Sequence, residues 1–185
     1  MLHTENVRYV ILAVLAGAIL AAPAAASGVD PQLLVLSQTD VPTGFQLERG
    51  ESGVRTNELE ARESPQTRAL FSRWRRVTGY QAAYARRTGR IEARADLFRD
   101  GRGAHNLLAW VDREFRRAGM KGLKRERAGV GNEGWVYWGG PSPGLAAVVW
   151  RYSRVWAGVG GMGLGKARTL ALARVQQQKI AAVVG

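Results

Sequence analysis

The N-terminal segment sets the limits within which this chain can fold. A short polar start that ends in Arg8 precedes an almost entirely apolar run over residues 9–20, and a stretch of small residues follows it. This three-part pattern is typical of a secretory signal peptide, and Ala24 and Ala26 are placed as the small residues that an export peptidase requires. The pattern therefore predicts a signal peptide over residues 1–26.

The same segment predicts where the protein acts. Its apolar run is too short to span a bilayer comfortably, because a spanning helix needs about 20 apolar residues. We therefore expect an exported protein, in the periplasm, in the cell wall or in the medium, with no spanning segment once the signal is cleaved. The alternative is an uncleaved N-terminal helix that anchors the chain in the membrane. Cleavage leaves residues 27–185, which are 159 of the 185 residues and suit one globular domain.

The absence of cysteine narrows the chemistry open to this domain. An exported domain without disulfides depends on its apolar core for stability. A cysteine nucleophile, a zinc–thiolate site and an iron–sulfur cluster are all excluded. We expect no cofactor and no metal.

Positive charge is concentrated in the middle of the sequence. The formal net charge is +12, and residues 62–127 hold 18 Lys and Arg against 7 Asp and Glu. Such a charge attracts anionic lipid, acidic cell-wall polymer or nucleic acid, and export makes nucleic acid the least expected of the three. A simple compositional preference for arginine is the alternative interpretation, since Arg outnumbers Lys 23 to 4.

Alternating residues give the clearest indication of secondary structure. Two strand candidates flank Thr88-Gly89 and predict an antiparallel hairpin. In the second strand every other residue, from Ile91 to Leu97, is apolar and is expected to face the core. The intervening charged residues are expected to form a solvated face with cross-strand charge pairs: Glu92, Arg94 and Asp96.

The remaining elements complete a fold prediction. Helical spacing of apolar residues predicts three helices. The first begins at Ser64-Pro65 and ends at Gly79, the second runs over 103–118, and the third runs over about 166–183. Further strands are expected over 134–138, 145–152 and 155–161, the last two as a hairpin that turns at Ser153-Arg154. We therefore predict a single α+β domain, an antiparallel sheet with two to three amphipathic helices packed on one face.

A glycine-rich segment, Gly158 to Lys166, approximates a phosphate-binding loop but does not fit one. Ala167 replaces the hydroxyl residue that would hold Mg²⁺, so we interpret the segment as a strand end and a turn. After the signal the only histidine is His105, which is interpreted as a partly exposed helix residue rather than a catalytic one. We assign no catalytic residues.

Aromatic residues crowd the C-terminal strands beside two arginines. Stacked aromatic rings with arginine suit sugar rings, lipid headgroups or single-stranded nucleic acid. Ordinary core packing is the alternative explanation for the same residues. The candidate ligand-binding residues are Trp135, Tyr137, Trp150, Arg151 and Arg154.

Four short segments carry a resemblance to a group of exported bacterial proteins. They are Asp40-Val-Pro-Thr-Gly-Phe45, Gly129-Val-Gly-Asn-Glu133, Val148-Val-Trp-Arg151 and residues 172–180. The group is similar in layout to the extracellular sensor domains of actinobacterial serine/threonine kinases and to related envelope lipoproteins. The resemblance implies a small α+β domain with a non-catalytic binding or envelope role, and it carries over no site residues.

The sequence thus supports one main expectation of function and one alternative. The first is an exported, non-enzymatic domain that binds an apolar or anionic component of the envelope, or a partner there; its oligomeric state is left open. The alternative is an exported hydrolase that uses a pair of carboxylates on envelope material, because such pairs can come from distant positions.

Overall fold

The fold is one large antiparallel sheet covered by helices. The computed structural model describes residues 28–142 and 144–185, so the signal peptide expected over residues 1–26 lies outside the described residues. Eight strands form a sheet in the order β1-β3-β4-β8-β7-β6-β5, and β2 also pairs with β3. The strands are β1 (Gln46–Leu47), β2 (Gly53–Val54), β3 (Arg76–Arg86), β4 (Gly89–Phe98), β5 (Leu123–Arg127), β6 (Glu133–Gly139), β7 (Ala146–Tyr152) and β8 (Val155–Met162).

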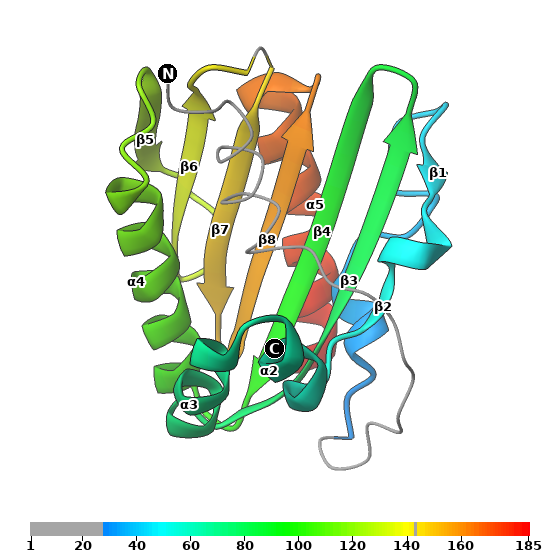
Figure 1. Ribbon diagram of the computed structural model, residues 1–185. Coiled ribbons are helices and arrows are strands. Elements are labelled where there is room, and N and C mark those ends of the chain that lie inside the picture. Colours follow the sequence, from blue (N-terminus) through cyan, green and yellow to red (C-terminus); the bar gives the residue numbers. More distant parts are fainter. Residues whose placement is uncertain (1–27, 143) are drawn as a thin grey trace.

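Four α helices and two 3-10 helices complete the described part of the chain (Figure 1). The antiparallel α+β architecture confirms the predicted fold class. The helices are α2 (Asn57–Glu63), α3 (Pro65–Arg73), α4 (Gly101–Arg117) and α5 (Gly165–Val184), with the 3-10 helices η1 (Pro31–Leu34) and η2 (Arg49–Glu51).

Two hairpins that the alternation predicts are present. Arg86 lies opposite Gly89 in the β3–β4 ladder, which leaves a turn of two residues between the strands. Tyr152 lies opposite Val155 in the β7–β8 ladder, so this hairpin turns at Ser153-Arg154 as expected. Because β8 pairs with both β4 and β7, it joins the N-terminal hairpin to the C-terminal meander in a single sheet.

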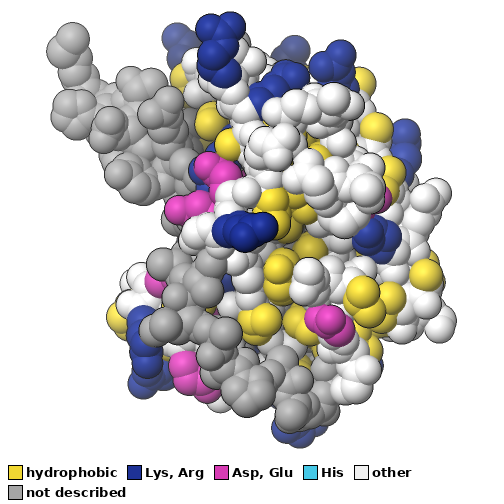
Figure 2. All heavy atoms as spheres, turned by 90° about the vertical axis from the view of Figure 1, so that its right-hand side faces the viewer, with side chains coloured by type: hydrophobic (Ala, Val, Ile, Leu, Met, Phe, Trp, Pro, Cys, Tyr) yellow, Lys and Arg dark blue, Asp and Glu magenta, His cyan; other side chains and the backbone are white. Residues whose placement is uncertain are grey.

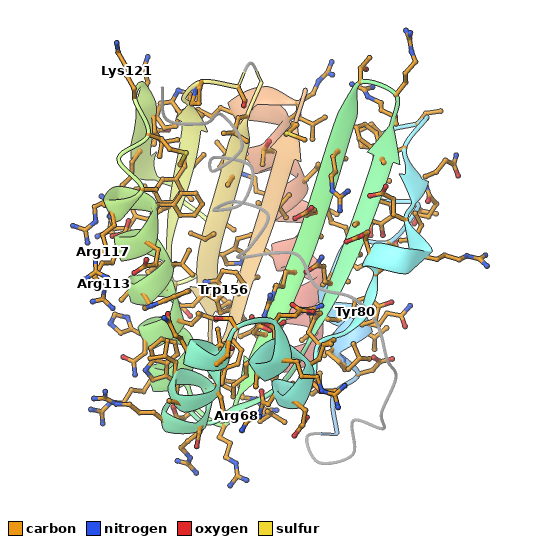
Figure 3. All side chains as sticks on the ribbon, in the orientation of Figure 1. Arg68, Tyr80, Arg113, Arg117, Lys121 and Trp156 are labelled. Carbon is orange, nitrogen blue, oxygen red and sulfur yellow. The ribbon has the colours of Figure 1, made fainter. Side chains whose placement is uncertain are left out.

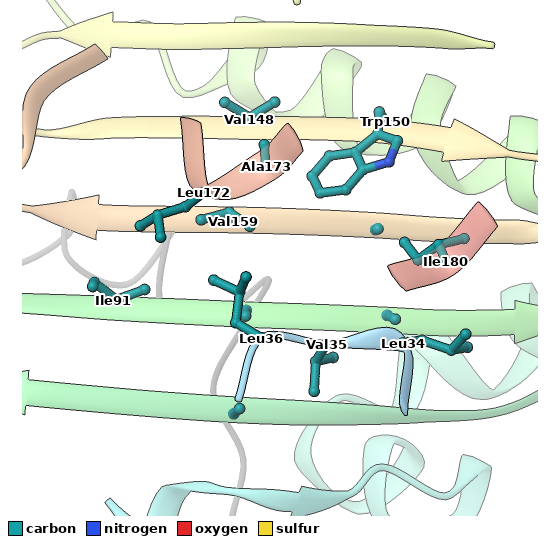
Figure 4. Packing of buried hydrophobic residues seen from close by; sticks show 14 of the residues in the cluster. Leu34, Val35, Leu36, Ile91, Val148, Trp150, Val159, Leu172, Ala173 and Ile180 are labelled. Carbon is teal, nitrogen blue, oxygen red and sulfur yellow. The ribbon is translucent and has the colours of Figure 1, made fainter. Parts of the chain in front are cut away.

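The helices differ from the expectation because they cover both faces of the sheet. Helix α5 and η1 pack on one face, over the larger core cluster, and α4 and α3 pack on the other face (Figure 1). Strand β7 explains this arrangement: Val148 and Trp150 point to the α5 side, whereas Ala147 and Val149 point to the α4 side. A strand that is apolar on both faces needs cover on both. Figure 4 shows Leu172, Ala173 and Ile180 of α5 over the strands of the first cluster.

The first long helix is shorter than its sequence pattern predicts. Instead of continuing to Gly79, α3 ends at Arg73, and β3 begins at Arg76. Between them Arg75 adopts a left-handed backbone conformation, with φ 58°, which turns the chain out of the helix. Arg76 then pairs with Phe98 at the end of β4, so the strand ladder takes up residues that the helical spacing assigned to the helix.

Candidate functional site

The five candidate ligand-binding residues divide between the two faces of the sheet. Gly134 lies opposite Trp150 in the β6–β7 ladder, so Trp135 and Tyr137 face the α4 side and Trp150 faces the α5 side. Trp150 is fully buried, and its indole Nε1 donates a hydrogen bond to Gln177 Oε1 at 2.7 Å. Trp150 is therefore a core residue of the α5 side.

Tyr137 is buried in the opposite cluster. Its ring stacks on Phe115 of α4, with 4.2 Å between the ring centroids. Its hydroxyl donates to Asp112 Oδ1 at 2.5 Å. Burial and this bond to a carboxylate raise the pKa of Tyr137. Tyr137 thus helps to fix Asp112 in place beneath the surface.

The two candidate arginines lie at one end of β7 and in the following turn. Arg151 and His105 both contact Glu133 Oε1, with His105 Nδ1 at 2.6 Å. Burial raises the pKa of Glu133, but the hydrogen bonds from His105 and Arg151 outweigh it and lower the pKa overall. Arg154 lies in the β7–β8 turn, where its carbonyl accepts a hydrogen bond from the amide of Phe98. The five residues do not form one surface, and a ligand-binding role for them stays a prediction.

Trp135 is the one candidate that the structure places among cations. The guanidinium carbon Cζ of Arg125 lies 3.3 Å from the centroid of its indole ring, and that of Arg127 lies 4.0 Å away. Both arginines belong to the edge strand β5, and Arg127 lies opposite Trp135 in the ladder. An aromatic face attracts such cations electrostatically, so Trp135 helps to hold two positive charges at the surface.

Asp112 fixes the first of these arginines. Arg125 donates from Nε to Asp112 Oδ1 at 2.6 Å and from Nη2 to Oδ2 at 2.9 Å. Desolvation lowers the pKa of Arg125, but the bonds to Asp112 outweigh it and raise the pKa. This bidentate pair gives the guanidinium one orientation, which two hydrogen bonds enforce better than one.

Together these residues belong to a basic surface that we name the α4–β5 surface. It is formed by exposed cations of α4, of the following turn and of β5, and Figure 3 shows Arg113, Arg117 and Lys121 on the same side of the molecule. Its cations are Arg113, Arg116, Arg117, Lys121, Arg125 and Arg127; Lys124, which lies opposite Trp138, faces the α5 side instead.

Only part of this charge is balanced. Asp112 accepts from Arg116 as well as from Arg125, and Glu114 pairs with Arg117 at 3.0 Å. Glu126 is the carboxylate of β5, and it pairs with Lys166 of α5 rather than with a cation of this surface. Within the described residues three cations of the surface form no ion pair: Arg113, Lys121 and Arg127. Unbalanced positive charge of this kind raises the local concentration of anions.

A second charged cluster corrects the prediction for β4. Glu92, Arg94 and Asp96 do not form a solvated face, because each of them is buried, at 4%, 3% and 1% exposure. Arg94 Nε bonds Asp96 Oδ2 at 3.0 Å, and Arg94 Nη2 bonds Glu60 of α2 at 3.0 Å. Arg94 and Asp96 are closed over by α2, α3 and α4, elements that the pattern of β4 alone cannot reveal, and Glu92 pairs with Arg90 of the same strand.

This buried cluster is one place where a pair of carboxylates for hydrolysis could be sought. Glu60 and Asp96 both border a hollow of only about 40 Å³, which is room for little more than water. Burial raises the pKa of Glu60, but the charges of Arg94, Arg76 and Arg55 outweigh it and hold the pKa at about 2. A general acid needs a raised pKa instead, so Glu60 is suited to an ion network and not to proton donation.

The glycine-rich segment has the structure expected for a strand end and a turn. Gly158 to Met162 belong to β8, between β4 and β7, so their backbone groups take part in the sheet ladders. Gly163 and Gly165 have positive φ values and lead into α5. Across residues 28–142 and 144–185, no group of three or more His, Asp or Glu side chains is arranged to hold a metal ion.

A solved structure shares this α+β fold. The extracellular domain of PknH from Mycobacterium tuberculosis, a serine/threonine kinase sensor domain, superposes with a TM-score of 0.58 and 8% identity. The match covers 84% of this chain and 98% of that one, which confirms the similarity in layout to kinase sensor domains. No protein-family model matches the chain, and no curated protein matches its sequence.

Within the part of the chain that the structure describes, no helix is both long and apolar enough to cross a membrane.

Proposed function

We propose that this protein is an exported, non-enzymatic domain that binds an anionic component of the cell envelope through the α4–β5 surface. The observation that carries the proposal is the group of unbalanced cations on this surface, one of which, Arg127, lies with Arg125 over the ring of Trp135. The N-terminal sequence pattern and the shared fold with an extracellular domain support export.

The anionic version of this proposal is better supported than the apolar one. Trp150 and Tyr137, which would supply much of an apolar site, are at most 1% exposed. The large hydrophobic residues that are exposed among those described, Leu33 and Leu47, lie on η1 and β1, far along the sheet order from β5. Figure 2 shows the β1 side, where Lys and Arg side chains are dispersed over the surface.

Binding to envelope material is expected to weaken steeply as salt rises. Exposed charges interact over about 10 Å at 0.1 M salt and over about 3 Å at 1 M. Sedimentation of the purified protein with envelope fragments of the producing organism measures this, from about 20 mM to 500 mM NaCl. We expect most of the protein in the pellet at the lowest salt and most of it in the supernatant at the highest.

Neutral vesicles of phosphatidylcholine serve as the control for this experiment. Because they carry no net charge, the protein should remain in solution with them at every salt concentration. Pelleting with the envelope that salt does not change, or no pelleting at any salt, would exclude an electrostatic mode of binding.

A further inference from the structure

A second basic feature lies at the other end of the molecule, where α3 meets β3. A hollow of about 340 Å³ is lined by four arginines from three different segments, together with Asn57 and Ser72. Figure 3 shows Arg68 at the α3 end, well away from the labelled cations of the α4–β5 surface. We name this hollow the arginine pocket; its four arginines are Arg68, Arg75, Arg76 and Arg99.

The floor of the arginine pocket is rigid. Arg76 is 4% exposed, and its Nε and Nη2 bond Asp96 Oδ1 at 2.9 and 2.5 Å. Its Nη1 donates to Asn57 Oδ1 at 2.7 Å, and Nη2 also donates to the carbonyl of Arg55 at 2.8 Å. The guanidinium lies over the ring of Phe71, 4.6 Å from its centroid. Asp96 balances the charge of Arg76. The contacts that fix Arg76 therefore involve none of the other three arginines of the pocket.

The rim carries positive charge that the protein does not balance. Arg68 and Arg99 are exposed, and neither forms an ion pair with any described residue. Arg75 has one partner, Asp100 Oδ2 at 3.3 Å, and both side chains are about half exposed, so that pair contributes little. Three guanidinium groups therefore share the rim with one weakly paired carboxylate. Like charges held together favour an anion between them.

The backbone holds two of these arginines side by side. Arg75 has φ 58°, a left-handed conformation that side chains other than glycine adopt rarely. The amide of Arg75 donates to the carbonyl of Ser72 at 3.1 Å, and its own carbonyl accepts from the amide of Arg99 at 3.1 Å. Strained backbone of this kind is found disproportionately where a side chain must be placed for binding. Here it places Arg75 next to Arg99 at the rim.

From these contacts we propose that the arginine pocket binds a compact phosphate group, either a phosphomonoester or a pyrophosphate. Guanidinium forks match the oxygen atoms of phosphate in pairs, and Asn57 and Ser72 offer further donors beside them. The volume is at the lower end of small-molecule sites, which suits a single headgroup and not a folded polymer. This site is separate from the α4–β5 surface and extends the proposed function.

Titration calorimetry with sodium pyrophosphate at low ionic strength tests the proposal. The unmodified protein is expected to bind pyrophosphate at one site per chain. In the double variant Arg68→Gln/Arg99→Gln the affinity should fall at least about tenfold, because two charged donors are removed. The matched control is Arg62→Gln/Arg73→Gln, which removes the same charge from exposed residues of α2 and α3 that do not line the pocket. Its affinity should change less than about threefold.

Three further measurements separate folding, the two surfaces and the source of the phosphate. All four substituted arginines are exposed, so thermal unfolding of both double variants should match the unmodified protein. Neutralising Arg113, Lys121 and Arg127 should leave pyrophosphate binding intact. In this neutralised variant, whose α4–β5 surface no longer attracts anionic vesicles, displacement from phosphatidic acid vesicles by pyrophosphate identifies a lipid headgroup as the source, whereas binding of pyrophosphate without binding of these vesicles identifies a soluble phosphate. Absence of pyrophosphate binding, or equal weakening in both double variants, would overturn the proposal.

Discussion

Replacing Asp96 by alanine is expected to destabilise the protein by about 3–5 kcal/mol. The substitution leaves Arg76 and Arg94 buried, at 4% and 3% exposure, without the carboxylate that both of them contact. An uncompensated buried charge is much more costly than a missing surface pair. Domains are stable by only about 5–15 kcal/mol. Unfolding in urea, followed by tryptophan fluorescence, should therefore have its midpoint at a much lower urea concentration than in the unmodified protein.

The matched control for this prediction is Glu114→Ala. Glu114 pairs with Arg117 one turn along α4, and that arginine is 68% exposed, so the change should be within about 0.5 kcal/mol. A loss of less than about 1 kcal/mol for Asp96→Ala would mean that the buried network is not the structural centre that its contacts indicate.

Replacing Trp150 by alanine is the second substitution with a large expected effect, again about 3–5 kcal/mol. The side chain is fully buried under α5, and its removal leaves both a cavity and Gln177 Oε1 without its donor. Trp135→Ala is the natural comparison, because Trp135 is only partly buried and contacts arginines at the surface. Its unfolding free energy should fall by less than half as much.

The two tryptophan variants also differ in what they should do to binding. Trp135→Ala should weaken sedimentation with envelope fragments, because Arg125 and Arg127 lose the ring that they contact. Trp150→Ala should not, at a temperature where it remains folded. The reverse result, with Trp150→Ala stable but defective in binding, would return Trp150 to the ligand-binding residues.

Much of the fold follows from local pattern in the sequence. Alternation along β4 correctly assigns Ile91 and its apolar neighbours to the core, and both hairpins are predicted: the β7–β8 turn lies at Ser153-Arg154 as expected, and the β3–β4 turn lies one residue before Thr88-Gly89. What alternation cannot provide is the identity of the element that covers each face. Glu92, Arg94 and Asp96 look like a solvated face, but α2 supplies Glu60 to Arg94, and Glu92 is buried against Arg90. The sequence does contain one indication of this burial: the charges on this face of β4 are of opposite sign, a pattern that also suits a buried ion network.

The candidate site was less accessible from sequence, for a reason of register. Trp135 and Trp150 both belong to predicted strands, but only the pairing of Gly134 with Trp150 shows that they face opposite ways. A shift of one residue would have placed them together. The sequence analysis also did not predict that Arg125 and Arg127 contact the ring of Trp135. Their spacing of two residues on a short strand does place both on one face.

The most direct test of the proposed function compares two triple variants of equal net charge. One replaces the unpaired cations of the α4–β5 surface by glutamine: Arg113, Lys121 and Arg127. The other replaces three exposed arginines that lie in the β3–β4 turn and on α5: Arg87, Arg168 and Arg174. Affinity for envelope fragments at about 20 mM NaCl is the quantity to measure.

If the α4–β5 surface carries the binding, the first triple variant should lose roughly 100-fold in affinity, at about 1 kcal/mol for each cation near an anionic surface. The second should lose less than about tenfold, because its substitutions lower the net charge without touching that surface. Equal losses in the two variants would contradict the proposal, since they would show that total charge matters and its placement does not.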